Sequence, residues 1–171
     1  INVKSLNRIW SADLITVDAK EDTENGVVAT TITKAGQTRK IWKYYILTVI
    51  DIYSRYGFFR FLPNKKSESI IQAFISILTE LQNLDIEIPI PKYLWVDQGA
   101  EFTDKEFDKK FLKANNIKMY FVKEKPVFIE RFNRTLKSEI YKLFTEKGDK
   151  VITEAEMQEI LTDYNNRRHS S

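Results

Sequence analysis

The chain of 171 residues carries a net charge of +3, and its 43% hydrophobic and 30% charged residues give the composition of one globular domain rather than of a disordered segment. The absence of cysteine excludes disulfides and thiolate metal sites, and a single histidine, His169, argues against a histidine-based zinc site. Any metal bound by this chain should therefore be a hard cation held by carboxylates, and the mild positive charge permits a polyanionic partner without requiring one.

Four segments in the first third of the chain predict strands. Each combines apolar or β-branched residues in an alternating or continuous run: 9–17, 27–33, 42–52 and 56–62. The run at 42–52 is nearly continuous in apolar residues, which is typical of a strand buried on both faces. Turn residues separate the segments, so we expect three or four neighbouring strands with antiparallel pairing.

After Ser67 the spacing of apolar residues changes from two to three and four, which favours helices. Ser67 suits an N-cap, and Thr153 with Glu156 has the form of a capping box. The expected order is a helix from Ser67, a strand at 92–96, a helix at 103–115, a strand at 117–122 and helices at 126–144 and 153–164. This order predicts an α/β fold in which helices flank a mixed sheet.

Three acids have settings that invite a catalytic interpretation. Asp13 lies inside an apolar strand, although on its own it is better explained as a polar position on an exposed strand face. Asp97 ends a short strand before a glycine turn, where α/β sheets place their sites and where turn-forming aspartates are also common. Glu130 lies one turn into the long helix, where an ordinary surface pair with Arg134 is the alternative.

Together, these three acids favour a metal site. The two strands can be neighbours, and the helix can pack over their edge. Three converging carboxylates repel one another unless a divalent cation compensates them, so Glu130 is expected to swing away without metal. Such a cage can hold two Mg²⁺ ions about 3.5–4 Å apart, as in phosphoryl transfer. Glu101 and Asp104 are expected only to cap the following helix.

Five motifs, in this order, resemble the integrase core of retroviruses, LTR retrotransposons and the Maverick/Polinton elements with their virophage relatives. They are WSADL at 10–14, YYILTVIDIYSRYGFFRFL at 44–62, VDQGAEF at 96–102, IERFNRTLK at 129–137 and YNNRRH at 164–169. The fourth is very close to the form found in the Maverick/Polinton group. The resemblance covers nearly the whole chain and implies a ribonuclease H-like fold, with a mixed five-stranded sheet flanked by helices.

The resemblance implies a DNA integrase catalytic core that performs 3′-end processing and strand transfer of element DNA into target DNA. Asp13, Asp97 and Glu130 would be its catalytic triad and would bind two Mg²⁺ (or Mn²⁺) ions. Asp51 is expected to be structural. DNA contacts are expected from one amide and two cations of the long helix, although an ordinary solvated helix face would also explain the cations: Asn133, Arg134 and Lys137.

Two other functions stay open: a ribonuclease H-type nuclease or cut-and-paste transposase, and an inactive domesticated core that only dimerises or binds a partner. The expected partners are element and target DNA and a second copy of the chain. Four aromatic residues could pack internally, but as a set they favour an exposed dimer surface: Phe58, Phe59, Tyr141 and Phe144. No small-molecule substrate is expected, and no apolar run is long enough to span a membrane. The implied location is the nucleus of a eukaryotic host, with packaging in a virus-like particle as an alternative.

Two departures from the family pattern stand out. The interval between Asp97 and Glu130 holds 32 residues, a few fewer than the family usually has, and the shortening falls at 123–127, which is expected to be poorly ordered. The stretch 18–40 is longer than the usual first hairpin, and the sequence assigns it no function. Both ends look cut, so residues 1–171 are expected to be a fragment of a longer protein.

Overall fold

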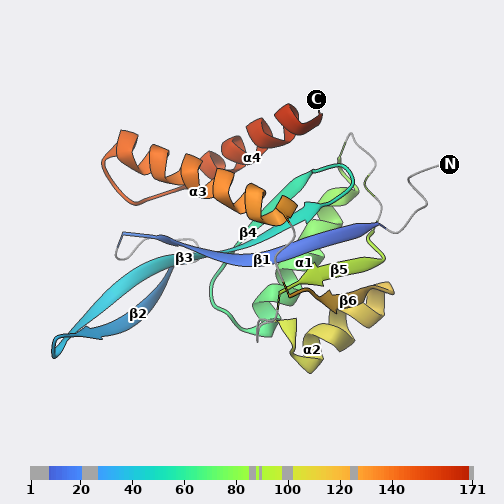
Figure 1. Ribbon diagram of the computed structural model, residues 1–171, viewed down its shortest axis with the longest axis horizontal. Coiled ribbons are helices and arrows are strands. Elements are labelled where there is room, and N and C mark those ends of the chain that lie inside the picture. Colours follow the sequence, from blue (N-terminus) through green and yellow to red (C-terminus); the bar gives the residue numbers. More distant parts are fainter. Residues whose placement is uncertain are drawn as a thin grey trace.

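The structure is a computed structural model, and it describes residues 8–20, 27–84, 88, 90–97, 102–123 and 127–169. Figure 1 shows a twisted sheet with α1 on one face and α3 and α4 on the other. The elements in chain order are β1 (Ile9–Asp18), β2 (Val27–Lys34), β3 (Gln37–Asp51), β4 (Gly57–Leu62), α1 (Ser67–Leu81), β5 (Tyr93–Val96), α2 (Lys105–Phe107), a π turn (Asp108–Leu112), a 3₁₀ turn (Lys113–Asn115), β6 (Lys118–Phe121), α3 (Val127–Lys147) and α4 (Glu154–His169). No helix of the described residues is long and apolar enough to cross a membrane.

The expected mixed five-stranded sheet is confirmed, in the order β4-β3-β1-β5-β6. The pairs β1/β3 and β3/β4 are antiparallel, whereas β1/β5 and β5/β6 are parallel. A sixth strand, β2, pairs with the same edge of β3 as β4 does. β2 pairs with Gln37 to Tyr44 of β3, and β4 pairs with β3 from Tyr45 onward. The first half of β3 and all of β2 therefore leave the body of the sheet as a two-stranded arm (Figure 1).

Side chains of β1 alternate between two apolar cores. Trp10 and Ala12 belong to the core beneath α1, whereas Ile15 and Val17 belong to the core beneath α3 and α4. This alternation is the period of two that a strand imposes, and here both faces of the strand are covered. Two-sided burial fixes the register, because a slip of one residue would place polar β1 side chains in both cores.

The expectation that four aromatic residues form an exposed surface is wrong for three of them. Phe58 and Phe59 are at most 2% exposed, because β4 is covered on both faces and its successive side chains enter opposite cores. Phe144 is also buried, on the side of α3 that faces the sheet. Tyr141 is 42% exposed and remains available on the surface.

Two of the helix caps expected from the sequence are confirmed, whereas one expected N-cap and one expected helix differ in the structure. The Asp104 Oδ1 accepts from the Glu106 backbone N–H (2.7 Å), and Thr153 and Glu156 bond each other's backbone N–H groups (3.1 Å each), so the Asp104 cap and the capping box are confirmed. Glu101 lies outside the described residues. The Ser67 N-cap is wrong, because Lys66 occupies that position without a side-chain cap. The single helix expected at 103–115 is instead a short α-helical turn followed by π and 3₁₀ turns.

Asn165 joins α4 to the first residue of β4. Its Oδ1 accepts from the Gly57 N–H (2.8 Å), and its Nδ2 donates to the Gly57 carbonyl (3.1 Å), so the amide side chain pairs with Gly57 as a strand would. A Cβ on Gly57 would lie 2.5 Å from the Phe132 ring, which makes glycine the residue that fits. The buried amide therefore satisfies both the N–H and the carbonyl group of Gly57.

We predict that Asn165→Ala lowers the free energy of unfolding by about 2–6 kcal/mol, because two buried backbone groups lose partners at about 1–3 kcal/mol each. The matched control is Asn166→Ala, since Asn166 is the exposed neighbour on the same helix. It should change stability by less than about 0.5 kcal/mol. Urea denaturation measures both, and equal effects would show that the Asn165 contacts contribute nothing specific.

Candidate functional site

The strand register places Asp13 and Asp97 side by side. β1 and β5 pair in parallel from Ile9 opposite Tyr93 to Ser11 opposite Trp95. Two further steps in this register bring Asp13 opposite Asp97, which directly follows β5. Residues at the same register position of neighbouring parallel strands project to the same face. The two acids therefore share one face at the carboxyl end of β5.

That face is the one covered by α3. Asp13 is only 6% exposed and alternates with Ala12, which enters the opposite core. The Asn133 Nδ2 of α3 donates to the Asp13 Oδ2 at 2.9 Å, and the Leu14 backbone N–H donates to the Asp13 Oδ1 at 2.9 Å. Both carboxylate oxygens are thus oriented by the protein.

Glu130 lies on α3, one turn before Asn133. Residues three apart on a helix lie on the same side, so Glu130 and Asn133 are neighbours on α3. The Glu130 side chain is exposed, whereas Asn133 is 7% exposed. The helix that carries Glu130 therefore contacts Asp13 through Asn133.

The first turns of α3 are fixed by aromatic contacts. The Arg55 guanidinium lies 3.2 Å from the centre of the Phe128 ring, and the Phe132 ring lies 4.9 Å from that of Tyr164. Arg55 takes a left-handed conformation (φ 65°) in the turn before β4. Contacts from this turn and from α4 thus set the position of the helix end that carries Glu130.

The three acids do not form a closed cage. No group of three or more His, Asp or Glu side chains among the described residues is placed to hold a metal ion. Glu130 is exposed on α3, and its expected displacement from the other two acids stays a prediction. Assignment of Asp13, Asp97 and Glu130 as metal ligands therefore stays a prediction.

The residues present nevertheless fit a hard cation. The Asn133 Oδ1 is buried and has no hydrogen-bond partner, because the amide turns its NH₂ group toward the Asp13 carboxylate. An acceptor oxygen without a donor lies here beside a buried carboxylate, with Asp97 at the next strand position. Two carboxylates and an amide oxygen are oxygen ligands, and such ligands match Mg²⁺ or Mn²⁺.

The structural role expected for Asp51 is confirmed. Asp51 is fully buried, and its Oδ2 accepts from the Ser54 N–H (2.8 Å) and the Ser54 hydroxyl (2.6 Å) and pairs with Arg8 (3.4 Å). These bonds shape the turn between β3 and β4. All three partners hold the carboxylate inside the fold, away from Asp13 on the next strand.

The candidate DNA contacts differ in exposure. Arg134 is exposed and Lys137 half-buried on α3, so both cations reach the surface near Glu130. Asn133 is buried against Asp13, so in this structure it holds the carboxylate. Of the segment 123–127, residues 124–126 lie outside the described residues, so its expected disorder stays a prediction.

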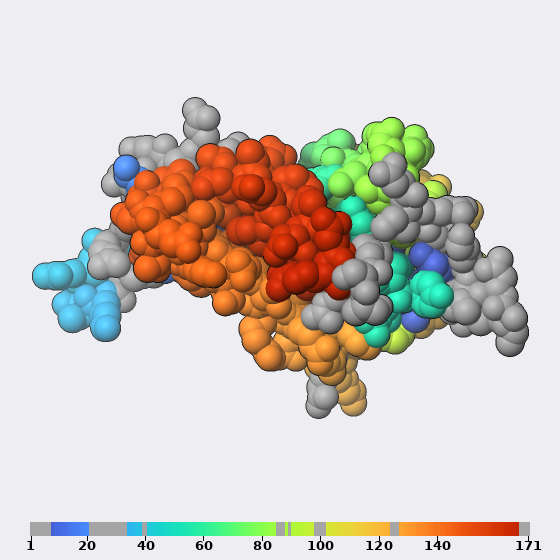
Figure 2. Space-filling model, turned by 90° about the horizontal axis from the view of Figure 1, so that it is seen from above, coloured from blue at the N-terminus to red at the C-terminus, as the bar shows by residue number. Residues whose placement is uncertain are grey.

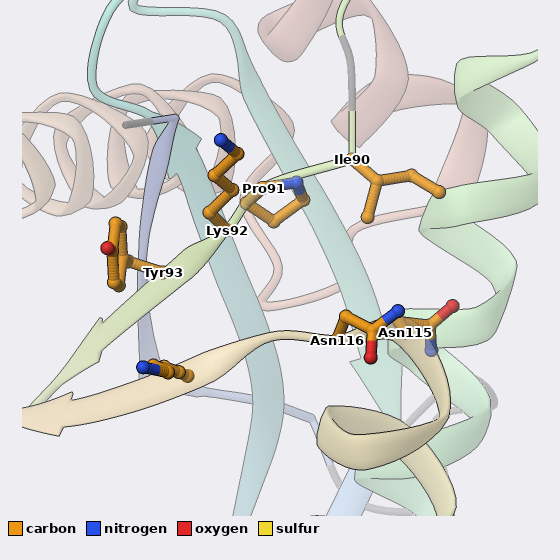
Figure 3. Close-up of a pocket in the computed structure, with 7 residues that line it drawn as sticks. Ile90, Pro91, Lys92, Tyr93, Asn115 and Asn116 are labelled. Carbon is orange, nitrogen blue, oxygen red and sulfur yellow. The ribbon is translucent and has the colours of Figure 1, made fainter. Parts of the chain in front are cut away.

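Sequence reasoning missed the supporting residues Arg55, Gly57 and Asn165. Asn165 falls in the last motif, and its position there was the available signal. A hollow of about 360 Å³, lined by seven residues including Pro91, Tyr93 and Asn116, lies at the other end of β5 (Figure 3). Its lining contains no acid, so the acids and this hollow are separate features.

The model of the integrase core domain family matches residues 4–125, and the chain belongs to this family. The matched range includes Asp13 and Asp97 and ends before Glu130. An uncharacterized transposon-derived protein of Caenorhabditis elegans is 31% identical over 125 residues, which are 71% of this chain and 41% of that protein. The chain thus spans less than half the length of this relative.

Solved integrases share the fold. The integrase of a simian T-cell lymphotropic virus intasome, in complex with a regulatory subunit of PP2A, has a TM-score of 0.66 at 17% identity over 91% of this chain and 47% of that one. The HTLV-2 integrase catalytic core, in complex with magnesium and in a dimeric form, has a TM-score of 0.60 at 19% identity over 91% of this chain and 83% of that one. The ribonuclease H-like fold expected from the sequence is confirmed by these likenesses.

We predict that Asn133→Ala destabilises the protein by about 1–3 kcal/mol, because the buried Asp13 carboxylate loses a donor. Arg134→Ala is the matched control, since Arg134 is the next residue of α3 and is exposed. Its effect should stay within about 0.5 kcal/mol. Urea denaturation at neutral pH gives both values. A neutral Asn133→Ala would mean that water replaces the amide at no cost.

Proposed function

We propose that this chain is the catalytic core of a DNA integrase that carries out 3′-end processing and strand transfer by phosphoryl transfer with two metal ions. One observation carries the proposal: Asp13 and Asp97 share a face on neighbouring parallel strands, and Asn133, one turn from Glu130, bonds Asp13. Membership of the integrase core family supports it.

Asp13, Asp97 and Glu130 would hold the two Mg²⁺ or Mn²⁺ ions. When bound, these ions supply activation of the attacking oxygen and stabilisation of the leaving 3′ oxygen. Asn133 keeps the Asp13 carboxylate in a fixed orientation. Arg134 and Lys137 lie along DNA phosphates, where cations position the duplex without reading its sequence.

The substrate and partners follow from the same proposal. The relative in Caenorhabditis elegans is transposon-derived, and the motif at 129–137 has the form of the Maverick/Polinton and virophage group, so we assign the element to that group. The partners are element and target DNA and a second copy of the chain, as in the dimeric relative. Integration into host DNA places the protein in the nucleus.

We predict that Asp13→Asn, Asp97→Asn and Glu130→Gln in the full-length protein each lower end processing and strand transfer by at least about a hundredfold, because several kcal/mol of charge stabilisation are lost. Asp163→Asn, on the exposed face of α4, is the control and should leave both reactions unchanged. Labelled duplex ends, resolved on gels, report both reactions.

The same assay separates the alternatives. Products that are cleaved but never joined to target DNA would indicate a ribonuclease H-type nuclease. Full activity of any one triad variant would remove that residue from the site. Absence of both reactions in the unmutated protein would favour an inactive core that acts as a binding module.

We also predict that Mg²⁺ or Mn²⁺ at about ten times its Kd raises the melting temperature by about 3–6 °C, because binding to the folded state alone adds about 1.4 kcal/mol. Asp13→Asn should lose most of this increase, whereas Asp163→Asn should keep it. Differential scanning calorimetry gives the result without relying on activity. An equal increase in both variants would place the metal elsewhere.

A further inference from the structure

The arm formed by β2 and the first half of β3 is a feature that the catalytic site does not use. Its strands pair from Val27 opposite Tyr44 to Lys34 opposite Gln37. The connecting residues Ala35 and Gly36 both have positive φ (54° and 77°), which is the geometry of a tight hairpin turn. Figure 1 shows the arm projecting beyond the rest of the molecule, and Figure 2 shows residues 34–38 of its tip at one end of the molecule.

The outer part of the arm does not pack into either hydrophobic core. Residues 34–38 at its tip are exposed, and nothing lies within 4 Å of a Cβ built on Gly36. Among the described side chains, the buried core of β3 begins only at Tyr44. An isolated two-stranded hairpin is marginally stable in water, so a projecting ribbon of this length is expected to gain a partner.

The root of the arm is fixed, in contrast to its tip. Lys43 donates to Asp18, and Lys150 lies 3.9 Å from the same carboxylate. The bond from Lys43 holds the pKa of Asp18 below its usual value, although partial burial opposes this. The Lys20 N–H also donates to the Lys150 carbonyl (3.1 Å). The turn between α3 and α4 thus contacts the end of β1, and Asp18 of β1 bonds Lys43 at the root of the arm.

The arm carries charge of one sign. Residues 27–42 contain three cations and no acid, in a chain that has 27 cations and 24 acids overall: Lys34, Arg39 and Lys40. Lys43 is left out of this set because Asp18 compensates its charge. Threonine and glutamine fill most of the other polar positions near the tip, and such side chains bond phosphate oxygens as well.

The arm lies at a distance from the acids that matches one turn of a DNA duplex. Thr48 is the register partner of Asp13, and Gln37 lies eleven residues further back along β3. At about 3.3 Å per residue this is about 35 Å, or roughly ten base pairs at 3.4 Å each. β1 runs from Asp13 toward the arm, so the arm extends from the end of the sheet at which Asp97 also lies.

We propose that the arm is a second DNA contact, which holds the phosphate backbone of a duplex about one helical turn from the reacting acids. The proposal rests on the proposed function. A two-stranded ribbon has the width that the major groove admits, and uniform positive charge favours DNA over a protein partner. Because its root is held in place, the arm raises the affinity for duplex DNA and orients the duplex across Asp13 and Asp97.

The test compares two triple variants of the full-length protein that remove the same charge. The arm variant is Lys34→Gln, Arg39→Gln and Lys40→Gln, and the control is Lys105→Gln, Lys109→Gln and Lys118→Gln, on exposed positions between α2 and β6. Duplex binding is titrated against salt. The arm variant should bind at least tenfold more weakly near about 0.1 M salt, and its log–log salt slope should fall by about 2–3, since each lost phosphate contact removes about 0.9. The control should keep the slope.

A gain-of-charge variant covers the case in which the arm variant unfolds. Gln37→Lys with Thr38→Lys adds two cations at exposed tip positions and should strengthen duplex binding and steepen the slope by up to about 2. Equal slopes for the arm variant and the control, with no gain for the lysine variant, would overturn the arm proposal. If the unmutated protein still joins DNA in that case, the proposed function stands. An unmutated protein that neither binds nor joins DNA overturns both.

The reaction step that fails shows whether the arm holds element DNA or target DNA. If the arm holds the element end, the arm variant should lose processing on ends of about 20 base pairs but match the unmutated protein on ends of about 8, which cannot reach the tip. If the arm holds target DNA, processing should be normal at both lengths, and only strand transfer from pre-processed ends should fall.

Discussion

One hydrogen bond, from the Asn133 Nδ2 to the Asp13 Oδ2, joins the first strand to the long helix at the acids. The two residues are 120 positions apart in the sequence, so the bond forms only when β1 and α3 are both in place. A buried carboxylate that loses a donor is destabilised, so the bond also favours this position of α3 over the sheet. The position of Glu130 follows from that choice.

Other contacts between α3, β4 and α4 support this one. Gly57 allows the Phe132 ring to approach the β4 backbone, Tyr164 packs on that ring, and Asn165 bonds Gly57 itself. These contacts come from β4 and α4, which lie far apart in sequence from Asp13. Residues that never approach the acids thus determine the geometry of the site.

The sequence predicted the elements that depend on local pattern. The alternation in β1 identified a strand, and the capping box at Thr153 identified the start of α4, because both signals come from adjacent residues. The family motifs pointed to Asp13 and Asp97, and the strand register brings the two together. Sequence gave no sign that Asn133 faces Asp13, since that contact depends on how α3 lies across the sheet.

Errors in prediction arose where tertiary contacts decide. Phe58 and Phe59 looked excessive for one core, but β4 lies between two cores and fills both. The segment after Asp104 has helical periodicity, yet a π turn there places Phe107 and Phe111 together against Phe74. In each case the local pattern was read correctly. What the neighbouring residues do not determine is how the rest of the fold packs against the element.

The three acids differ in how firmly the fold holds them, and this difference has a physical consequence. Asp13 lies on a central strand with both oxygens bonded, and Asp97 directly follows the strand paired with it. Glu130 lies on the exposed side of the first turn of α3. Bringing a third carboxylate to a fixed pair raises the electrostatic energy unless positive charge compensates it. An exposed Glu130 side chain on α3 therefore avoids most of this repulsion, while the bond from Asn133 keeps α3 against β1.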